Sequence, residues 1–226
     1  MIIAGRKINR IVASGCSFTY GQGLDDPKTE SWPAQLSKMF DVECVNLAKI
    51  GHGNEHVQDS IIDYIAKNPL HVSDSFIIPC FSTYSRIEFP LISPENTFTF
   101  ATIMSSKTKP EFTQMFFRDF FCPKYYYRRY MRIIILLQES LKNRDILYLM
   151  FDGLGTNPHE RFANDHDILQ LDDQVDKSKW LGFKLKNIDN MTSPKDRLAD
   201  GHPNKNAYAQ TADILYQHII NTYATE

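Results

Sequence analysis

The sequence lacks a long apolar run, a marked charge bias and paired cysteines, and each absence excludes a class of protein. No segment could span a bilayer, and residues 1–10 have neither the apolar stretch nor the cleavage site of a secretory signal. Lys and Arg number 25 against 27 Asp and Glu, so the net charge of −2 gives no attraction to nucleic acid or to an anionic membrane. We therefore expect a cytoplasmic protein whose partner is a small molecule or a neutral polymer, and the composition says nothing of its oligomeric state.

The sequence also lacks a metal-binding pattern. Its four cysteines, Cys16, Cys44, Cys80 and Cys122, lie far apart without the paired spacing of a zinc site, and we expect them to be reduced. His52, His56 and Asp59 recur at helical spacing, but no glutamate follows the first histidine as in zinc-protease helices, and nothing completes a ligand set. Neither a metal nor an organic cofactor is expected.

Strand-like and helix-like apolar patterns alternate along the chain. Hydrophobic residues make up 42% of the sequence, enough for one substantial core, so we expect a single domain over residues 1–226. Short apolar runs predict strands at residues 8–14, 44–48, 75–80, 145–151 and 183–188, and helical spacing predicts helices at 30–40, 57–65, 124–143 and 204–223. This alternation predicts an α/β fold with an open, mostly parallel sheet covered by helices on both faces. Ligands of such sheets bind at the carboxyl ends of the strands.

Several segments depart from this pattern. Residues 89–113 are too long for an ordinary connection, and we expect an irregular excursion that could roof a site. Residues 153–179 are acidic and poorly periodic, which indicates a mobile loop or a short-helix insertion. Pro79 indicates a sheet margin or a bulge. The aromatic and basic cluster at residues 125–130 is compatible with nucleic-acid binding, but a core-facing stripe continues beyond it, so we interpret its rings as packing.

The chemistry-bearing residues lie near the two ends of the chain. The first strand runs into Gly-Cys-Ser at residues 15–17, a tight turn that would lift the Ser17 hydroxyl from the end of the sheet. Asp200 and His202 precede the last helix, where the aspartate could fix the imidazole tautomer. Together they supply a nucleophile, a base and an orienting carboxylate. The structural alternatives are a turn serine, a structural histidine, and Asp200 or Asn204 as a helix cap.

Three blocks of residues carry a family resemblance. Gly-Cys-Ser-Phe at residues 15–18 looks like the Gly-Asp-Ser block of the SGNH (GDSL-type) hydrolases, Asn-Leu-Ala-Lys-Ile-Gly at 46–51 resembles their second block, and Asp-Gly-His-Pro at 200–203 resembles their last. The blocks follow the family's order over nearly the whole chain. The resemblance implies a flavodoxin-like three-layer α/β/α sandwich.

The resemblance also implies roles for particular residues. Ser17 would be the nucleophile, His202 the general base and then acid, and Asp200 the orienting carboxylate. In the family the oxyanion is held by the backbone N–H of the serine, by the N–H of the second-block glycine, here Gly51, and by a third-block asparagine side chain. Asn54 lies near Gly51 as a helper of this site or as a helix cap.

The sequence departs from the family pattern in three places. Cys16 replaces the usual aspartate beside the serine, and the last block has one residue fewer between its aspartate and histidine. The third block, Gly-x-Asn-Asp, is absent, and Ser82 stands where its asparagine would be. Its hydroxyl could complete the oxyanion hole, or Ser82 could be a turn serine.

Arg86 and Glu88 follow Ser82, and we interpret them as a charged pair. Pointing inward they would position a substrate or brace the loop, and pointing outward they would be solvated surface.

These residues predict a serine hydrolase that cleaves esters of small molecules or carbohydrates, with removal of carbohydrate O-acetyl groups as one candidate reaction. The alternative, motivated by the missing asparagine, is a catalytically weak or inactive module that binds a glycan or a protein partner in the same cleft. The acyl group cannot be read from the sequence.

Overall fold

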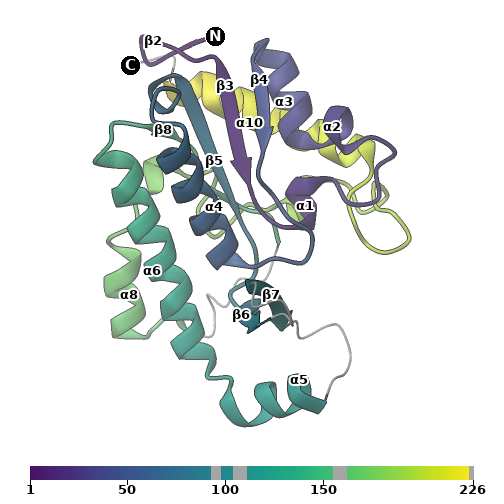
Figure 1. The fold of residues 1–226 in the computed structure, drawn as a ribbon, viewed down its shortest axis with the longest axis vertical. Helices are drawn as coiled ribbons and strands as arrows, with labels where there is room; N and C mark the ends of the chain where they lie inside the picture. The colour runs from purple at the N-terminus through teal and green to yellow at the C-terminus, as the bar shows by residue number, and fades with distance from the viewer. Residues whose placement is uncertain (93–97, 104–110, 155–161, 224–226) are drawn as a thin grey trace.

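The protein is built around a parallel sheet, seen in a computed structural model that describes residues 1–92, 98–103, 111–154 and 162–223. Its strands lie in the order β4 (Glu43–Asn46), β3 (Arg10–Ser14), β5 (Ser75–Phe81) and β8 (Leu147–Tyr148) (Figure 1). Counted along the chain this is the order 2-1-3-4 of flavodoxin-like folds. A further short strand, β9 (Phe151–Asp152), pairs with the end of β5. The predicted α/β fold with a mostly parallel sheet is confirmed.

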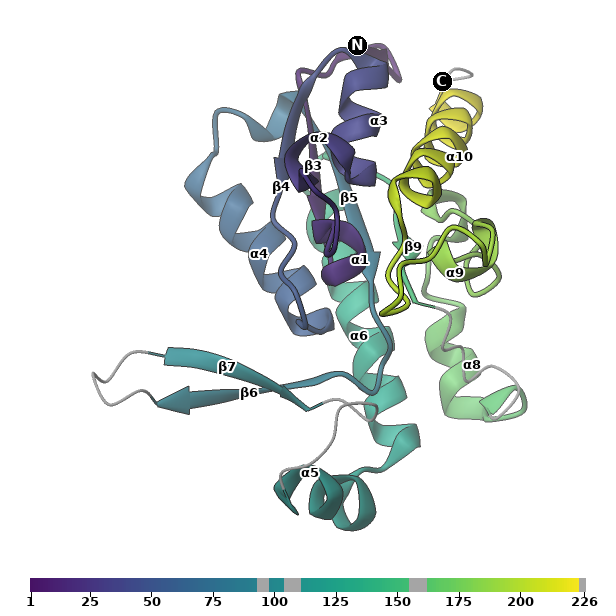
Figure 2. The same cartoon turned by 90° about the vertical axis from the view of Figure 1, so that its right-hand side faces the viewer.

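Alternating strand side chains build a separate core on each face of the sheet. Ile11 and Ala13 of β3 belong to one hydrophobic cluster and Val12 to the other, because successive side chains of a strand point to opposite faces. The first face is covered by α3 (Trp32–Phe40) and α10 (Lys205–Tyr223), and the second by α4 (Asn54–Lys67) and α6 (Pro123–Lys142) (Figures 1 and 2). The chain is therefore a three-layer α/β/α sandwich.

Shorter elements connect these layers. They are β1 (Ile2–Ile3) and β2 (Arg6–Lys7), the helices α1 (Ser17–Tyr20), α2 (Pro27–Glu30), α5 (Glu111–Met115), α8 (His166–Asp172) and α9 (Ile188–Met191), a π-helix at Phe116–Phe120, and 3₁₀ turns at Val72–Asp74 and Lys177–Lys179. The segment 153–179 thus contains short helices in its described part, while residues 155–161 lie outside it. No helix of the described ranges is long and apolar enough to cross a membrane.

The aromatic cluster at the start of α6 is used for packing. The rings of Tyr127 and Tyr130 are buried, whereas Tyr125 is exposed. Nη1 of Arg128 forms an ion pair with Oδ2 of Asp167 at 3.3 Å. The interpretation of this cluster as core packing is confirmed for the two buried tyrosines.

Residues 89–113 were expected to be an irregular excursion, and the irregular conformation is wrong in the described part of this segment, although the segment does project from the sandwich (Figure 2). β6 (Ile87–Ile92) and β7 (Phe98–Ile103) form an antiparallel hairpin in which Ile87 lies opposite Ile103. Both isoleucines are buried together with Phe116, so this arm has a small core of its own. Figure 2 shows the hairpin extending away from the sandwich. Residues 93–97 and 104–110 lie outside the described part of the chain.

The strand predicted at residues 145–151 is divided into β8 and β9. Residues 76–77 of β5 pair with β8 and residues 80–81 pair with β9, which leaves a break beside Pro79. The break suits a residue that has no N–H to donate to the ladder. On its other side Pro79 pairs with Ser14, so β5 is a central strand and the alternative of a sheet margin is wrong.

The strand predicted at residues 183–188 is also wrong. Gly182 and Lys184 have φ angles of 60° and 64°, in the left-handed region, and the chain turns here instead of extending. The N–H groups of residues 185 and 186 both donate to the backbone oxygen of Gly182. The sheet continues past β9 only as isolated bridges among the described residues, such as the one between Asp152 and Asn187.

Candidate active site

Ser17 lies just beyond the carboxyl end of β3, at the first position of α1. The passage from strand to helix depends on Gly15, because a Cβ there would lie 2.1 Å from Oγ1 of Thr19 and 3.0 Å from the backbone oxygen of Cys80. Ser17 is 3% exposed. The hydroxyl of Tyr208, on α10, donates to the backbone oxygen of Ser17 at 3.5 Å. The predicted turn therefore exists and is held between the neighbouring strand and the last helix.

His202 lies in a tight turn directly before α10. The N–H of Leu198 donates to the backbone oxygen of His202 at 2.7 Å, and Gly201 has the left-handed φ of 85° that this turn requires. Asn204 accepts hydrogen bonds from the N–H groups of residues 206 and 207 at 2.9 and 3.1 Å, so it is the residue that caps α10. The alternative of Asp200 as the helix cap is wrong.

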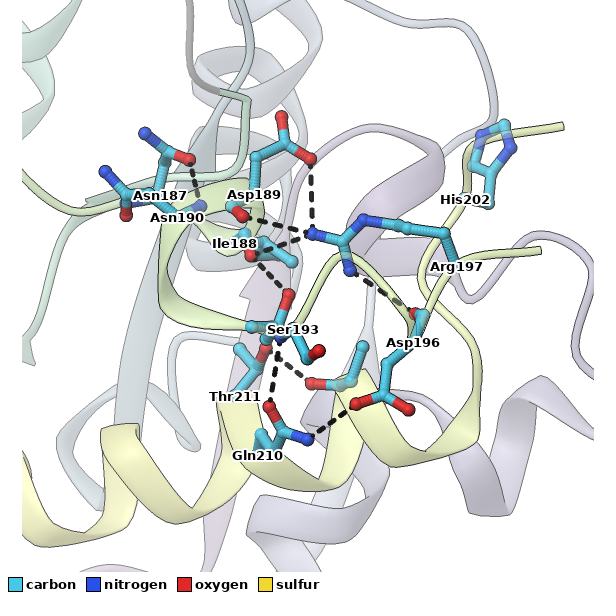
Figure 3. Close-up of polar contacts among 12 residues, drawn as sticks. Asn187, Ile188, Asp189, Asn190, Ser193, Asp196, Arg197, His202, Gln210 and Thr211 are labelled. Atoms are coloured by element: carbon cyan, nitrogen blue, oxygen red, sulfur yellow. Dashed lines mark hydrogen bonds and ion pairs between the residues drawn. The ribbon is translucent and has the colours of Figure 1, made fainter. Parts of the chain in front are cut away.

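A polar network braces the turn from below, as Figure 3 shows. Nη2 of Arg197 donates to the backbone oxygens of Ile188 at 3.2 Å and Asp189 at 3.4 Å. Nε2 of Gln210 donates to Oδ2 of Asp196 at 2.9 Å. The ring of His202 points away from this network in Figure 3, so the braces fix the backbone and leave the imidazole free of it.

Asp200 contacts His202 at two points. Oδ1 accepts the backbone N–H of His202 at 3.1 Å, and Oδ2 lies 2.9 Å from Nδ1 of the ring. The second contact is an ion-pair distance, although Nδ1 has no hydrogen-bond partner of good angle within the described ranges. The backbone N–H, and after it the ring, hold the pKa of Asp200 below its usual value. The shortened last block therefore still delivers the carboxylate to the imidazole.

The two ends of the chain meet at this edge of the sheet. The rings of Phe18 and His202 pack with centroids 5.3 Å apart, and Phe18 directly follows Ser17. A Cβ on Gly23 would lie 2.4 Å from Cδ1 of Leu198, so the loop after α1 also touches the histidine turn. No hydrogen bond joins the Ser17 hydroxyl to His202 within the part of the chain that the structure describes. The structure thus places the predicted base against the residue that follows the predicted nucleophile.

The loop after β4 lies against the turn that carries Ser17. The N–H of Lys49 donates to the backbone oxygen of Gly15 at 3.1 Å, and Nδ2 of Asn46 donates to that of Thr19 at 3.0 Å. Further along, Gly51 has a φ of 81°. The backbone N–H groups of Ser17 and Gly51 donate to no acceptor among the described residues, so both are available to a ligand.

Asn54 is buried and binds the backbone that follows β5. Its Oδ1 accepts the N–H of Ser82 at 2.7 Å, while Nδ2 donates to the backbone oxygens of Ser82 at 3.1 Å and Thr83 at 3.3 Å. Gly53 is the N-cap of α4, so the alternative of Asn54 as a helix cap is wrong. Oγ of Ser82 is buried without a hydrogen-bond partner in the described part of the chain.

Arg86 and Glu88 do not form the predicted charged pair. Oε1 of Glu88 lies 2.9 Å from Nδ1 of His52 and accepts the N–H of Gly53 at 2.7 Å. Nη1 of Arg86 donates weakly to the backbone oxygen of His52 at 3.5 Å. The Glu88 side chain is 5% exposed, because β6 turns it inward onto the loop after β4.

The histidines of this loop have protein partners. Nε2 of His56 lies 3.0 Å from the backbone oxygen of Leu47, and His52 is engaged by Glu88. In the described ranges, no group of three or more His, Cys, Asp or Glu side chains is placed to hold a metal ion.

A cavity of about 1090 Å³ opens between α4 and the loop after β4. Its lining includes Tyr20 at the end of α1, Lys49, Gln58, Asp59 and Lys67, but neither Ser17 nor His202. The cavity therefore adjoins the candidate site, and its lining mixes these polar side chains with apolar ones such as Leu47 and Ile62.

Solved structures similar to this chain share one fold. They include a protein assigned to the G-D-S-L lipolytic family from Desulfitobacterium hafniense DCB-2, with 13% identity, a TM-score of 0.53, and coverage of 93% of this chain and 99% of that one. The chain has the SGNH-hydrolase fold. The psychrotrophic esterase EstA from Pseudoalteromonas sp. has 13% identity and a TM-score of 0.55, covering 94% of this chain and 97% of that one. The acetyl xylan esterase Est2A from Butyrivibrio proteoclasticus has 13% identity and a TM-score of 0.53, covering 96% of this chain and 64% of that one.

No protein-family model matches the chain, and no curated protein matches it. The resemblance to SGNH hydrolases seen in the sequence is confirmed at the level of the fold, since identities near 13% carry no more than that.

Two polar contacts beside the site were not predicted from the sequence. Glu88 binds the loop at Gly53, as described above. Asp152, at the end of β9, is buried and accepts a hydrogen bond from the Tyr130 hydroxyl at 2.6 Å. Burial raises the pKa of Asp152 to about 6. The sequence signal for Asp152 is a carboxylate that ends an apolar strand, whereas nothing local marks the long-range contact of Glu88.

Proposed function

We propose that this SGNH-fold chain is a serine hydrolase that cleaves esters, with Ser17 as the nucleophile. The observation that carries the proposal is the packing of His202 on Phe18, with ring centroids 5.3 Å apart, because it unites the first and last blocks of the sequence. Three further features support it. Asp200 lies 2.9 Å from Nδ1 of the imidazole, and the backbone N–H groups of Ser17 and of Gly51 donate to no acceptor in the described ranges.

In the proposed reaction His202 acts as a base and then as an acid. Nε2 of His202 accepts the Ser17 hydroxyl proton as Oγ attacks the acyl carbon, which forms a tetrahedral oxyanion. The oxyanion collapses, the ester C–O bond breaks, and the imidazolium returns its proton to the leaving alkoxide. A water molecule, deprotonated by His202, then attacks the acyl-serine, the bond between the acyl carbon and Oγ breaks to release the carboxylic acid, and the imidazolium returns its proton to Oγ of Ser17. Asp200 stabilises the imidazolium in both halves of the cycle.

The oxyanion is held by preorganised donors in this proposal. The backbone N–H groups of Ser17 and Gly51 supply two hydrogen bonds, and Ser82 is the third donor because its buried hydroxyl has no partner among the described residues. Asn54 supports this donor indirectly, because its side chain fixes the backbone of Ser82. Asn54 and Arg86 are then supports of the site, not direct ligands of a substrate.

We further propose acylated carbohydrates as the substrate class. The lining of the cavity beside the site combines hydroxyl, amide and charged side chains with apolar ones such as Leu47 and Ile62, a mixture that suits the hydroxyl groups and the C–H faces of a sugar. Est2A, a protein of similar fold, is an acetyl xylan esterase. A substrate whose small acyl group lies at Ser17 and whose sugar alcohol extends toward Lys49 would occupy both the candidate site and the adjoining cavity.

Covalent labelling of Ser17 tests the hydrolase proposal. A fluorophosphonate probe should label the wild-type chain and release its fluoride, and Ser17→Ala should abolish both labelling and turnover of p-nitrophenyl acetate. The matched control is Ser14→Ala, since Ser14 lies at the end of the same strand with its hydroxyl 2.7 Å from that of Ser60. Labelling should persist in that control. His202→Ala should slow labelling without changing the folded state.

Absence of labelling in a folded wild-type chain would contradict the proposal. That result would favour the alternative of a catalytically inactive SGNH-fold module, and binding of acetylated and deacetylated oligosaccharides would then be compared directly. Labelling that survives Ser17→Ala would also contradict the assigned nucleophile.

A further inference from the structure

Glu88 joins the projecting hairpin to the loop that carries Gly51. Its carboxylate is almost fully buried, with 5% of the side chain exposed, and a single oxygen, Oε1, makes both contacts to the loop. This oxygen accepts the N–H of Gly53 at 2.7 Å and lies 2.9 Å from Nδ1 of His52. A buried carboxylate is retained at low cost only when such partners satisfy it.

The backbone of the hairpin also packs tightly on this loop. A Cβ on Gly53 would lie 2.7 Å from the backbone oxygen of Arg86 and 3.3 Å from Oε2 of Glu55, so only glycine lets the two segments approach. The loop is therefore fixed at its carboxyl end by the hairpin. At its amino end it is fixed by the hydrogen bond of 3.1 Å from Lys49 to Gly15, beside the nucleophile turn.

Gly51 lies between these two anchor points. With its left-handed φ of 81°, Gly51 belongs to a turn that the N–H of His52 closes by donating to the backbone oxygen of Lys49 at 3.4 Å. The direction of the Gly51 N–H depends on how the two ends of this turn are held. The direction is consequently set by the residues on either side, and on the carboxyl side these are His52 and Gly53. A donor displaced by about 1 Å from a developing charge loses much of its effect on rate.

We propose that Glu88 is a positioning residue that aims the Gly51 N–H at the oxyanion by holding His52 and Gly53. The inference rests on the proposed function. In it, the position of the acceptor oxygen Oε1 of Glu88 matters, and the negative charge of the carboxylate does not. Glu88 touches neither Ser17 nor the reacting atoms in this assignment. Its contribution is realised when negative charge develops on the acyl oxygen, so it raises kcat and leaves ground-state binding nearly unchanged.

Three variants of Glu88 separate acceptor position from charge. Glu88→Gln keeps an oxygen where Oε1 stands and removes the charge, and its kcat should stay within about threefold of wild type. Glu88→Asp keeps the charge but withdraws the carboxylate by about 1.5 Å, one C–C bond. Glu88→Leu removes the acceptor at similar volume. For Glu88→Asp and Glu88→Leu, kcat should fall roughly 10- to 100-fold while KM stays within about threefold of wild type. Loss of a whole oxyanion donor would lower kcat more, by about 10²- to 10³-fold.

Glu55→Leu is the matched control. Glu55 is a second glutamate near this loop, at the start of α4, with 20% of its side chain exposed, and its Oε1 pairs with Nε of Arg129 at 3.0 Å and not with the loop backbone. Its kcat should stay within about twofold of wild type, since it holds no oxyanion donor. The rate of fluorophosphonate labelling should follow kcat in every variant, because both reactions place an oxygen in the same hole.

Amide hydrogen exchange gives a readout that does not depend on turnover. The Gly53 N–H should be protected in the wild-type chain and in Glu88→Gln, and should exchange faster in Glu88→Asp, which is the variant to rely on if Glu88→Leu does not fold. Unchanged exchange, or kcat of Glu88→Asp equal to wild type, would overturn the role of Glu88. A fall in kcat for Glu88→Gln as large as the fall for Glu88→Leu would also overturn this role. Turnover that persists in Ser17→Ala would instead refute the hydrolase proposal, and this inference with it.

Discussion

The carboxylate of Asp200 lies 2.9 Å from Nδ1 of His202, although a single residue separates them in the chain. The turn makes this possible, because Gly201 adopts a left-handed φ of 85° and lets the carboxylate fold back over the ring. The same carboxylate accepts the His202 N–H, so one side chain fixes both the backbone and the imidazole. The Asp200 side chain is 52% exposed, which weakens its electrostatic effect relative to a buried aspartate.

Replacing Asp200 by Asn should therefore slow the proposed reaction moderately. We expect kcat/KM to fall on the order of 10²-fold, less than the roughly 10⁴-fold loss when a buried triad aspartate becomes an amide. Steady-state hydrolysis of p-nitrophenyl acetate measures the effect. The control Asp213→Asn changes an exposed aspartate of α10 and should leave kcat/KM unchanged. Equal rates for Asp200→Asn and wild type would contradict an orienting role.

Gly15→Ala should disturb the nucleophile turn. The added Cβ would overlap Oγ1 of Thr19 at 2.1 Å, and forced overlap in a packed site costs about 1–3 kcal/mol. We expect a lower unfolding free energy in urea together with slower Ser17 labelling. Gly5→Ala adds a Cβ where no atom lies within 4 Å, so it should cost only about 1–2 kcal/mol, because of its left-handed φ of 70°, and should leave labelling unchanged. A Gly15→Ala chain as stable and reactive as wild type would show that this turn tolerates a side chain.

Local sequence patterns predicted the sheet and the parts of the site that lie at its edge. Ser17 and His202 could be paired in advance because parallel strands end at a common edge, and the last helix starts there too. The hairpin was missed because its Ser- and Pro-rich surroundings concealed the alternation around Phe89 and Phe100. Lys184 was misread because a left-handed residue that is not glycine leaves no trace in composition. The contact of Glu88 with Gly53 spans 35 positions and depends on the hairpin, so no local rule could have given it.

The four cysteines should differ sharply in reactivity toward a disulfide reagent. Cys122 is exposed, Cys44 is half-buried, and Cys16 and Cys80 are buried. Burial raises the thiol pKa of Cys44 and of Cys80, which lowers their thiolate fraction. Titration with an aromatic disulfide in buffer should show one fast thiol, one slow thiol, and two that react only after unfolding. Cys122→Ser should remove the fast phase, and finding fewer than four thiols in denaturant would contradict the reduced state.

Asp152 should make the stability of the fold depend on pH in a direction unusual for an aspartate. Burial raises its pKa from 3.8 to about 6, and the hydrogen bond from Tyr130 offsets only part of that shift. Between these two values the folded state binds the proton that the unfolded state releases. The contribution of Asp152 to stability is therefore complete below about pH 4 and is lost as the pH rises through 6.

Asp152→Asn should remove this dependence. The amide oxygen can still accept the Tyr130 hydroxyl. We therefore expect the unfolding free energy of the variant minus that of wild type to be up to roughly 3 kcal/mol more favourable to the variant at pH 7.5 than at pH 4. Urea unfolding of both chains at several pH values measures this difference, and other titrating groups cancel in the comparison. If Asp152→Asn instead lost stability as the pH rose from 4 to 7.5, the carboxylate would be stabilised in its charged form, and the effect of burial would be smaller than that of its partners.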